Sequence, residues 1–83
     1  MMKDDRTNVM PLSRAPSGSQ VVITRIIGGR GFRRRLSDMG LVRGASFRVV
    51  KSFQPGPCVI SFQESKLGLG HGMASKIMVK VKE

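Results

Sequence analysis

The sequence predicts a mainly β fold: a small barrel with one short inserted α-helix over about residues 32–39 and a helical turn near residues 71–76. Short runs of alternating apolar side chains, separated by turn residues, recur along the chain, and this pattern is typical of small barrels. Phe32, Leu36 and Met39 instead fall at helical spacing, which predicts a helix whose apolar stripe faces the core. A helix this short is unstable alone in water, so we expect it to pack across the sheet.

The segment around this helix carries the clearest local signals. Residues 20–27 are rich in valine and isoleucine and predict the first strand. The glycine-rich residues 28–31 predict a loop that leads into the helix. Gly40 stands where a left-handed residue ends a helix, and Leu41 can then contact Leu36 as in a Schellman motif.

The second half of the chain predicts a hairpin and a closing strand. The alternation breaks at Lys51, which indicates a bulge or a twist near this residue. Residues 54–57, Gln-Pro-Gly-Pro, predict a tight turn, because proline sets the first central position and glycine accepts a positive φ at the second. Closing the sheet would cover the edges that short strands otherwise expose. The strands expected after the helix are residues 45–53, 58–63, 66–69 and 77–82.

The chain has 83 residues, which suffices for one domain with one thin core. Residues 1–10 are polar and without periodicity, so we expect a flexible tail followed by a single domain over residues 11–83. The start of translation stays open between Met1 and Met10.

The apolar runs of the chain are shorter than the ~20 residues of a membrane span, and its first residues do not resemble a secretory signal. We expect a cytoplasmic protein, and a single cysteine fits a reducing compartment.

The composition is strongly basic, with 15 lysines and arginines against five aspartates and glutamates, a net charge of +10. Unless it serves solubility alone, this excess predicts an anionic counterpart: nucleic acid, an acidic membrane surface or an acidic protein. Enzyme activity is not expected. The chain has no paired carboxylates, no base beside a nucleophile and no phosphate-binding loop followed by lysine.

No bound metal and no cofactor is expected. A closed zinc site needs cysteines and histidines in pairs, and Fe(II) prefers imidazole with carboxylate, whereas Cys58 and His71 have no partners at ligand spacing. Cys58 is in phase with Ile60 and Phe62, so we expect it in the core. His71 stands on a glycine-flanked turn, where it is either solvated or ligates a metal across an oligomer.

Three consecutive arginines, Arg33, Arg34 and Arg35, lie in the first turn of the predicted helix. The helix dipole makes this end partly positive, so each arginine costs about 0.3–1 kcal/mol at low salt. Together with Arg43 and Lys66 they predict a surface that binds an anion or an acidic protein, or else a solvated basic face. Base stacking is not expected, because tryptophan and tyrosine are absent and the phenylalanines are in phase with the core, but phosphate contacts stay open.

Several short motifs follow one another in a particular order between Leu12 and Val81. They are Gly18, Ile26-Ile27, Gly29, Arg35-Leu36, Met39-Gly40, Gly44, Leu67–Gly70, Ala74 and Ile77–Val79. In their order and spacing the chain resembles the FeoA family of small cytosolic proteins. Ser17, Arg43 and Glu64-Ser65 depart from the family's pattern, and these departures concern local turn types rather than the fold.

The resemblance implies an SH3-like β barrel with an inserted helix and no catalytic activity. It implies a cytosolic accessory protein of ferrous iron uptake that docks on the FeoB-type transporter and regulates or stabilises it. The expected contact residues are Arg33, Arg34, Arg35, Arg43 and Lys66. Attraction to the anionic inner face of the membrane would assist docking.

Several functional questions stay open at this stage. A similar module ends the iron-dependent repressors, so the alternative is a basic SH3-like module for nucleic-acid binding or repressor-type regulation. The sequence also leaves open whether the partner is activated, stabilised or inhibited, the stoichiometry and oligomeric state, and any dependence on the partner's nucleotide state.

Overall fold

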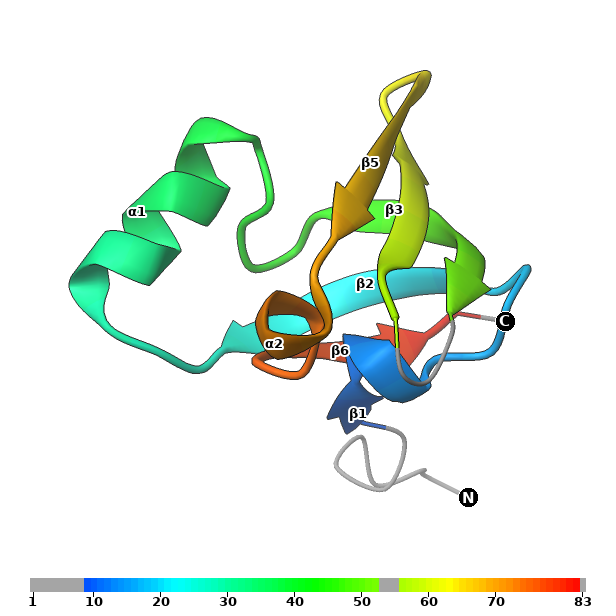
Figure 1. Cartoon of the computed structure of the whole chain (residues 1–83), viewed down its shortest axis with the longest axis horizontal. Helices are drawn as coiled ribbons and strands as arrows, with labels where there is room; N and C mark the ends of the chain where they lie inside the picture. Colours follow the sequence, from blue (N-terminus) through cyan, green and yellow to red (C-terminus); the bar gives the residue numbers. More distant parts are fainter. Residues whose placement is uncertain (1–8, 53–55, 83) are drawn as a thin grey trace.

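The computed structural model describes residues 9–52 and 56–82, which form a six-stranded antiparallel sheet rolled around one core (Figure 1). The strand order is β1-β6-β2-β3-β4-β5. The strands are β1 (Val9–Pro11), β2 (Gln20–Ile26), β3 (Ser46–Ser52), β4 (Cys58–Phe62), β5 (Ser65–Leu69) and β6 (Ile77–Val81). The helical segments are the 3-10 helix η2 (Leu12–Arg14), α1 (Arg30–Asp38) and α2 (His71–Ala74). The predicted mainly β fold with a short inserted helix and a later helical turn is confirmed.

Hydrogen bonding does not close this sheet into the full ring that we expected. Within the described residues the two end strands, β1 and β5, are not paired with each other. Instead η2 follows β1, α2 follows β5, and these two helical turns contact each other. Their residues Leu12 and Ala74 are fully buried. The seam between the end strands is therefore shielded by side chains rather than by a ladder of hydrogen bonds.

The core is built from the inward-facing residues of the strands. In β3, β4 and β6, buried residues alternate with less buried ones, as the sequence predicts. The register of β3 against β4 shifts between Val49 and Lys51, which confirms the predicted bulge. The rings of Phe47 and Phe62 meet edge to face, with their centroids 6.2 Å apart. The largest fully buried side chains are Leu12, Val21, Ile23, Leu36, Leu41, Val49, Ile60, Leu69, Ile77 and Val79.

The end of α1 has the predicted Schellman geometry. Gly40 has a φ of +87°, and its N–H donates to the carbonyl of Ser37 at 2.9 Å. The N–H of Leu41 donates to the carbonyl of Leu36, also at 2.9 Å. Both leucines are fully buried in the same core cluster, as the hydrophobic contact of this motif requires. This stop turns the chain back toward the barrel.

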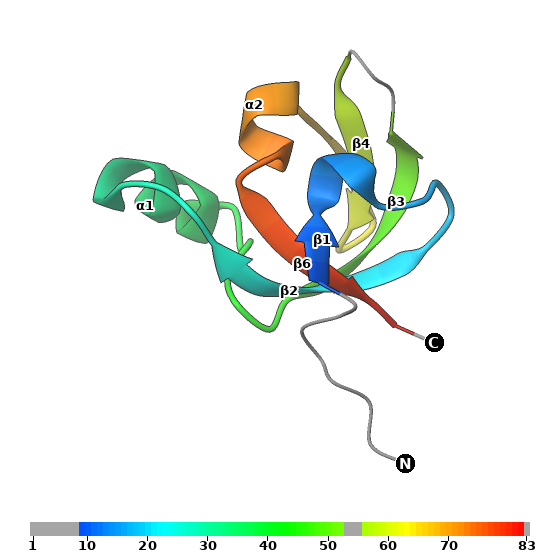
Figure 2. The same cartoon turned by 90° about the horizontal axis from the view of Figure 1, so that it is seen from below.

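The position of α1 differs from the expectation in two respects. The helix begins earlier than predicted, at Arg30, and it projects from the side of the barrel instead of lying across the sheet (Figures 1 and 2). Leu36 is its only buried residue, and Phe32 is half-buried against the core. Met39, predicted in the core stripe, is 36% exposed. It follows the last residue of the helix as the C-cap, so the helical periodicity no longer determines where its side chain lies.

The expected boundary between tail and domain is also too late. Val9 and Met10 belong to β1 and pair with Lys80 and Val79 of β6, and Met10 packs against the core. Because β1 is an edge strand of only three residues, it shows no periodicity in the sequence, which is why the sequence pattern does not reveal it. The rest of the predicted tail, Phe53 and the first half of the turn predicted at residues 54–57 lie outside the described residues.

Candidate partner-binding surface

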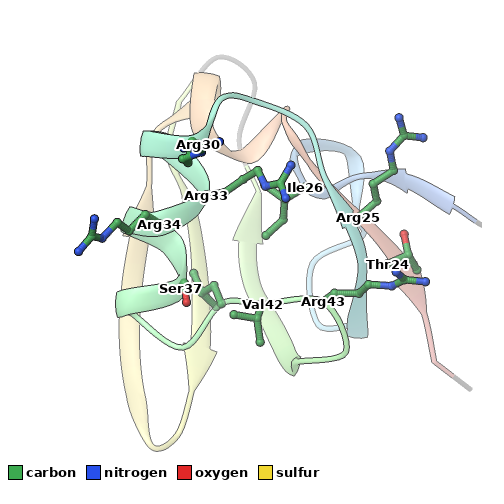
Figure 3. A pocket seen from close by; sticks show the side chains of 10 residues that line it. Thr24, Arg25, Ile26, Arg30, Arg33, Arg34, Ser37, Val42 and Arg43 are labelled. Atoms are coloured by element: carbon green, nitrogen blue, oxygen red, sulfur yellow. The ribbon is translucent and has the colours of Figure 1, made fainter.

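The structure has an open hollow of about 1020 Å³ between α1, the C-terminal end of β2 and the chain that follows the α1 stop (Figure 3). Its residues are Thr24, Arg25, Ile26, Arg30, Arg33, Arg34, Ser37, Leu41, Val42 and Arg43. We call this feature the arginine hollow. It exists because α1 stands off the barrel, so the segment that leaves β2 and the segment that returns to β3 enclose a space instead of packing together.

The spacing of residues along α1 explains why the helix brings several arginines to this hollow. Arg30, Arg33, Arg34 and Ser37 follow one another at helical intervals of three, one and three residues, so they share one face. Figure 3 shows Arg33 reaching from this face into the hollow toward Ile26, whereas Arg34 projects away from it. The helix thus contributes one guanidinium inside the hollow and others along its rim.

The two remaining arginines come from outside the helix. Arg25 lies near the end of β2, and Arg43 lies just after the Schellman stop of α1. In Figure 3 the side chain of Arg43 extends to Thr24 of β2, on the side of the hollow opposite α1. All five arginines are exposed, so their charges face water.

The floor of the hollow is apolar. Leu41 is fully buried, Ile26 is half-buried with its side chain directed into the hollow, and Val42 is 42% exposed. Because a large aliphatic side chain is exposed beside several arginines, the surface offers both apolar and ionic contacts. A ligand that fits it would combine negative charge with an apolar group.

Within residues 9–52 and 56–82, none of the five guanidinium groups has an ion-pair partner. The acidic residues of this part of the chain are Asp38 and Glu64, and neither lines the hollow. The first turn of α1 has no acidic residue, and Gly29 provides no side-chain cap. The partial positive charge of the helix N-terminus therefore adds to the charge of the arginines.

The structure brings together three of the five predicted contact residues. Arg33, Arg34 and Arg43 line the hollow, whereas Arg35 is exposed elsewhere on α1 and Lys66 lies on β5, outside the hollow. Arg25 and Arg30 were missed. Arg30 could have been found, because it stands three residues before Arg33, but the glycines around it predicted a loop. Arg25 carries no such signal, since its neighbours depend on where α1 stands.

The residues considered for metal binding do not form a ligand set. In the described segments no group of three or more His, Cys, Asp or Glu residues comes together. Cys58 is buried in β4, as predicted, and burial raises the pKa of its thiol, while a hydrogen bond with the Ser52 side chain lowers it in part. His71 is exposed at the start of α2. Among the described residues, no helix has the length and apolar character needed to cross a membrane.

Comparison with known proteins identifies the family. The model of the FeoA domain matches residues 10–81, almost the whole of the described barrel. The chain belongs to the FeoA family. It is 39% identical over 70 residues to a protein of Methanocaldococcus jannaschii named "Putative Fe(2+) transport protein A", and the match covers 84% of each chain. The family predicted from the sequence is thus confirmed.

Solved structures confirm the fold. A crystal structure of an iron uptake regulatory protein, FeoA, is similar to this chain with a TM-score of 0.82 and 35% identity, over 89% of this chain and 99% of that one. A manganese-dependent transcriptional repressor is similar over 89% of this chain and 42% of its own, with a TM-score of 0.79 and 18% identity. The likeness to the repressor shows a shared fold alone. The SH3-like barrel expected for a FeoA protein is therefore present.

Proposed function

We propose that this chain is a non-enzymatic accessory protein of ferrous iron uptake that docks on the cytosolic part of the FeoB-type transporter through the arginine hollow. Membership of the FeoA family supports the link to iron uptake, since its relatives carry names of Fe(2+) transport and iron uptake regulation. The observation that carries the docking surface is a set of five exposed arginines without carboxylate partners in the described chain, around an apolar floor.

The charge of the chain fits a role in recognition better than a role in fold stability. Arg30 and Arg33 lie in the first turn of α1 and oppose the helix dipole, whereas Arg35, expected in the first turn, lies in the last one. A sequence adjusted only for helix stability would place acidic residues in the first turn. Complementary charge speeds the encounter of two proteins and sets their orientation more than it deepens affinity. We therefore assign to Arg25, Arg30, Arg33, Arg34 and Arg43 the task of steering an acidic surface of the transporter onto the hollow.

The proposal places the protein in the cytoplasm, at the inner face of the membrane when it is docked. Anionic lipids there attract basic residues by about 1 kcal/mol each close to the surface. With a net charge of +10, the chain would concentrate near this surface before it meets the transporter. Docking is then the specific step, and lipid attraction supplies only proximity.

Charge reversal in the hollow tests this function. Arg33→Glu combined with Arg34→Glu should weaken binding to the transporter's cytosolic domain about 10- to 100-fold, because two attractions become repulsions. The affinity is measured by titration calorimetry at low and at physiological salt. The circular dichroism spectrum should stay that of the parent, since both residues are exposed.

The matched control is Arg14→Glu combined with Arg35→Glu, which changes the net charge by the same amount at exposed residues outside the hollow. It should weaken binding only a few-fold, through the general loss of attraction. If the two double variants lose the same amount of affinity for the transporter domain, the hollow is not the docking surface. If the parent chain does not bind the transporter domain at all, the transporter is not its partner.

A further inference from the structure

One edge of β2 is open beside the arginine hollow. The pairing of β2 with β3 covers Gln20–Val22. It is extended by two bonds: the Ile23 N–H donates to the Ala45 carbonyl at 2.9 Å, and the Gly44 N–H donates to the Ile23 carbonyl at 2.8 Å. After Ile23 the segment that returns to β3 no longer follows β2.

The strand nevertheless continues beyond this point. Arg25 and Ile26 pair with Met78 and Ile77 of β6, so the last part of β2 is held on that side. On the opposite side, within the described chain, no strand accompanies residues 24–26. These residues line the hollow, and α1 stands on its far side (Figure 3). The hollow therefore contains an edge of the sheet that is available for pairing.

We propose that the arginine hollow receives an extended acidic segment of the partner, which adds to the open edge of β2 as an extra strand. This inference rests on the proposed function, and it names the way in which the same surface binds. Addition of a strand supplies main-chain hydrogen bonds, while pockets beside the edge read alternate side chains. The space between β2 and α1 offers both kinds of contact.

The side chains around this edge define the chemistry of the segment. Arg33 reaches into the hollow from α1, and Arg43 extends to Thr24 on the side opposite α1, so carboxylates of the segment meet guanidinium groups on both sides. A guanidinium can bind a carboxylate through two parallel hydrogen bonds, which fixes orientation as well as charge. The apolar floor, Ile26 and Val42, accepts an aliphatic side chain. Side chains of a strand alternate, so the expected pattern is acidic and aliphatic in turn.

Charge also determines which occupants are excluded. An open strand edge invites pairing with a second copy of the same chain, and basic residues on the edge oppose this. Arg25 occupies the edge, and two copies of a chain with a net charge of +10 repel each other. A phosphate ion or a lipid headgroup would engage the arginines but would leave the edge of β2 and the apolar floor unused. An acidic peptide strand uses all three features.

Backbone methylation of a peptide probe gives a sharp test. The probe is a capped peptide of about eight residues with alternating glutamate and valine, long enough to span the ~10 Å of three strand residues. Two analogues carry N-methyl groups, one on the odd-numbered amides and the other on the even-numbered amides. Only alternate amides of an added strand donate to the edge, so one analogue should bind about as well as the parent peptide and the other at least ~10-fold more weakly.

Binding to the isotope-labelled full chain is followed by NMR. The peptide should shift the amide resonances of Thr24, Arg25 and Ile26 and slow hydrogen exchange along this edge. Arg33→Glu should weaken peptide binding at least ~10-fold, whereas the matched control Arg35→Glu, on the same helix but outside the hollow, should weaken it less than ~3-fold. If the two methylated analogues bind with the same affinity, whether unchanged or reduced, the proposal that the peptide adds as a strand is wrong.

Two further measurements separate this inference from the proposed function. If the transporter's cytosolic domain binds but neither competes with the peptide nor slows exchange at residues 24–26, the added strand is wrong and the docking proposal stands. If the methylation pattern is found but the domain does not bind, the strand site stands and the assigned partner is wrong. Saturable binding to phosphatidylglycerol vesicles that depends on Arg33, with no binding of the peptide, would overturn the inference in favour of lipid.

Discussion

At Gly40 the backbone conformation and the space around the residue both require glycine. Its φ of +87° lies in the left-handed region, where a β-branched side chain is strained. A Cβ added here would also approach the ring of Phe62 to 3.1 Å. Gly40→Val should therefore lower the free energy of unfolding by at least ~2 kcal/mol, measured by urea denaturation.

The matched control for this prediction is Gly44→Val. Gly44 has a similar φ of +93°, but a Cβ at this position meets no atom within 4 Å. Its replacement should cost the backbone strain alone, on the order of 1–3 kcal/mol, and less than the change at Gly40. A parent-like denaturation curve for Gly40→Val would contradict the role of this residue as the helix stop.

Cys58 links the stability of the core to pH. Burial raises the pKa of its thiol above the ordinary 9.0, so the folded state holds the proton more tightly than the unfolded state does. The associated stability is fully present below pH 9.0 and is lost as the pH rises beyond it, because the unfolded thiol ionises first. Cys58→Ala should reduce the fall in the free energy of unfolding between about pH 8 and pH 10, measured by urea titration. If the free energy of unfolding of Cys58→Ala falls over this pH range as much as that of the parent, the link between burial of the Cys58 thiol and pH-dependent stability is wrong.

Helix α1 is the element with the weakest attachment to the barrel. It buries one residue, and its N-terminus has neither a capping side chain nor an acidic residue. A helix of this length has little stability of its own, so its position depends on Leu36, Leu41 and the half-buried Phe32. The ammonium of Lys76 lies 5.5 Å from the centroid of the Phe32 ring and adds a cation–π contact from the barrel side.

Truncation of the buried residue of α1 tests this attachment. Leu36→Ala should lower the free energy of unfolding by about 2–5 kcal/mol, because it removes a fully buried side chain and leaves a cavity. The neighbouring exposed residue is the control, and Arg35→Ala should stay within about 0.5 kcal/mol of the parent. Both values come from urea denaturation. Equal stability of the two variants would mean that α1 is not held through its buried leucine.

Elements that depend on local pattern could be predicted from the sequence, and their spatial combination could not. The alternation in β3, β4 and β6 and the glycine stop of α1 are encoded within a few residues, so the sequence was sufficient to predict them. The site depends on the angle at which α1 leaves the barrel. That angle brings Arg25 of β2 to the hollow and leaves Lys66 of β5 outside it, and no spacing along the chain predicts the angle.

At the scale of the whole molecule, charge governs non-specific association. A net charge of +10 on 83 residues attracts any polyanion, so weak binding to DNA at low salt is expected and carries no functional meaning by itself. Each neutralised phosphate contributes about 0.9 to the slope of log affinity against log salt. Specific recognition differs from this background by surviving at physiological salt.

Salt dependence therefore separates the two functional classes. If five arginines contact phosphates, raising the salt from about 50 to 200 mM should weaken duplex DNA binding roughly 500-fold, and single strands somewhat less. Fluorescence anisotropy with two unrelated sequences measures this, and we expect equal affinities for both. Binding that persists at the higher salt with a preference for one sequence would favour a nucleic-acid-binding module over a transporter accessory.

The two hydrogen bonds between Ile23 and the Gly44-Ala45 segment bring the chain back to the point at which it left. Between these bonds the chain makes an excursion that includes α1 and the arginine hollow and that is anchored to the core through Leu36 and Leu41. Substitutions at its exposed residues can therefore change the charge of this excursion while the strands keep their register. What this surface recognises can thus change without any change in the rolled sheet that supports it.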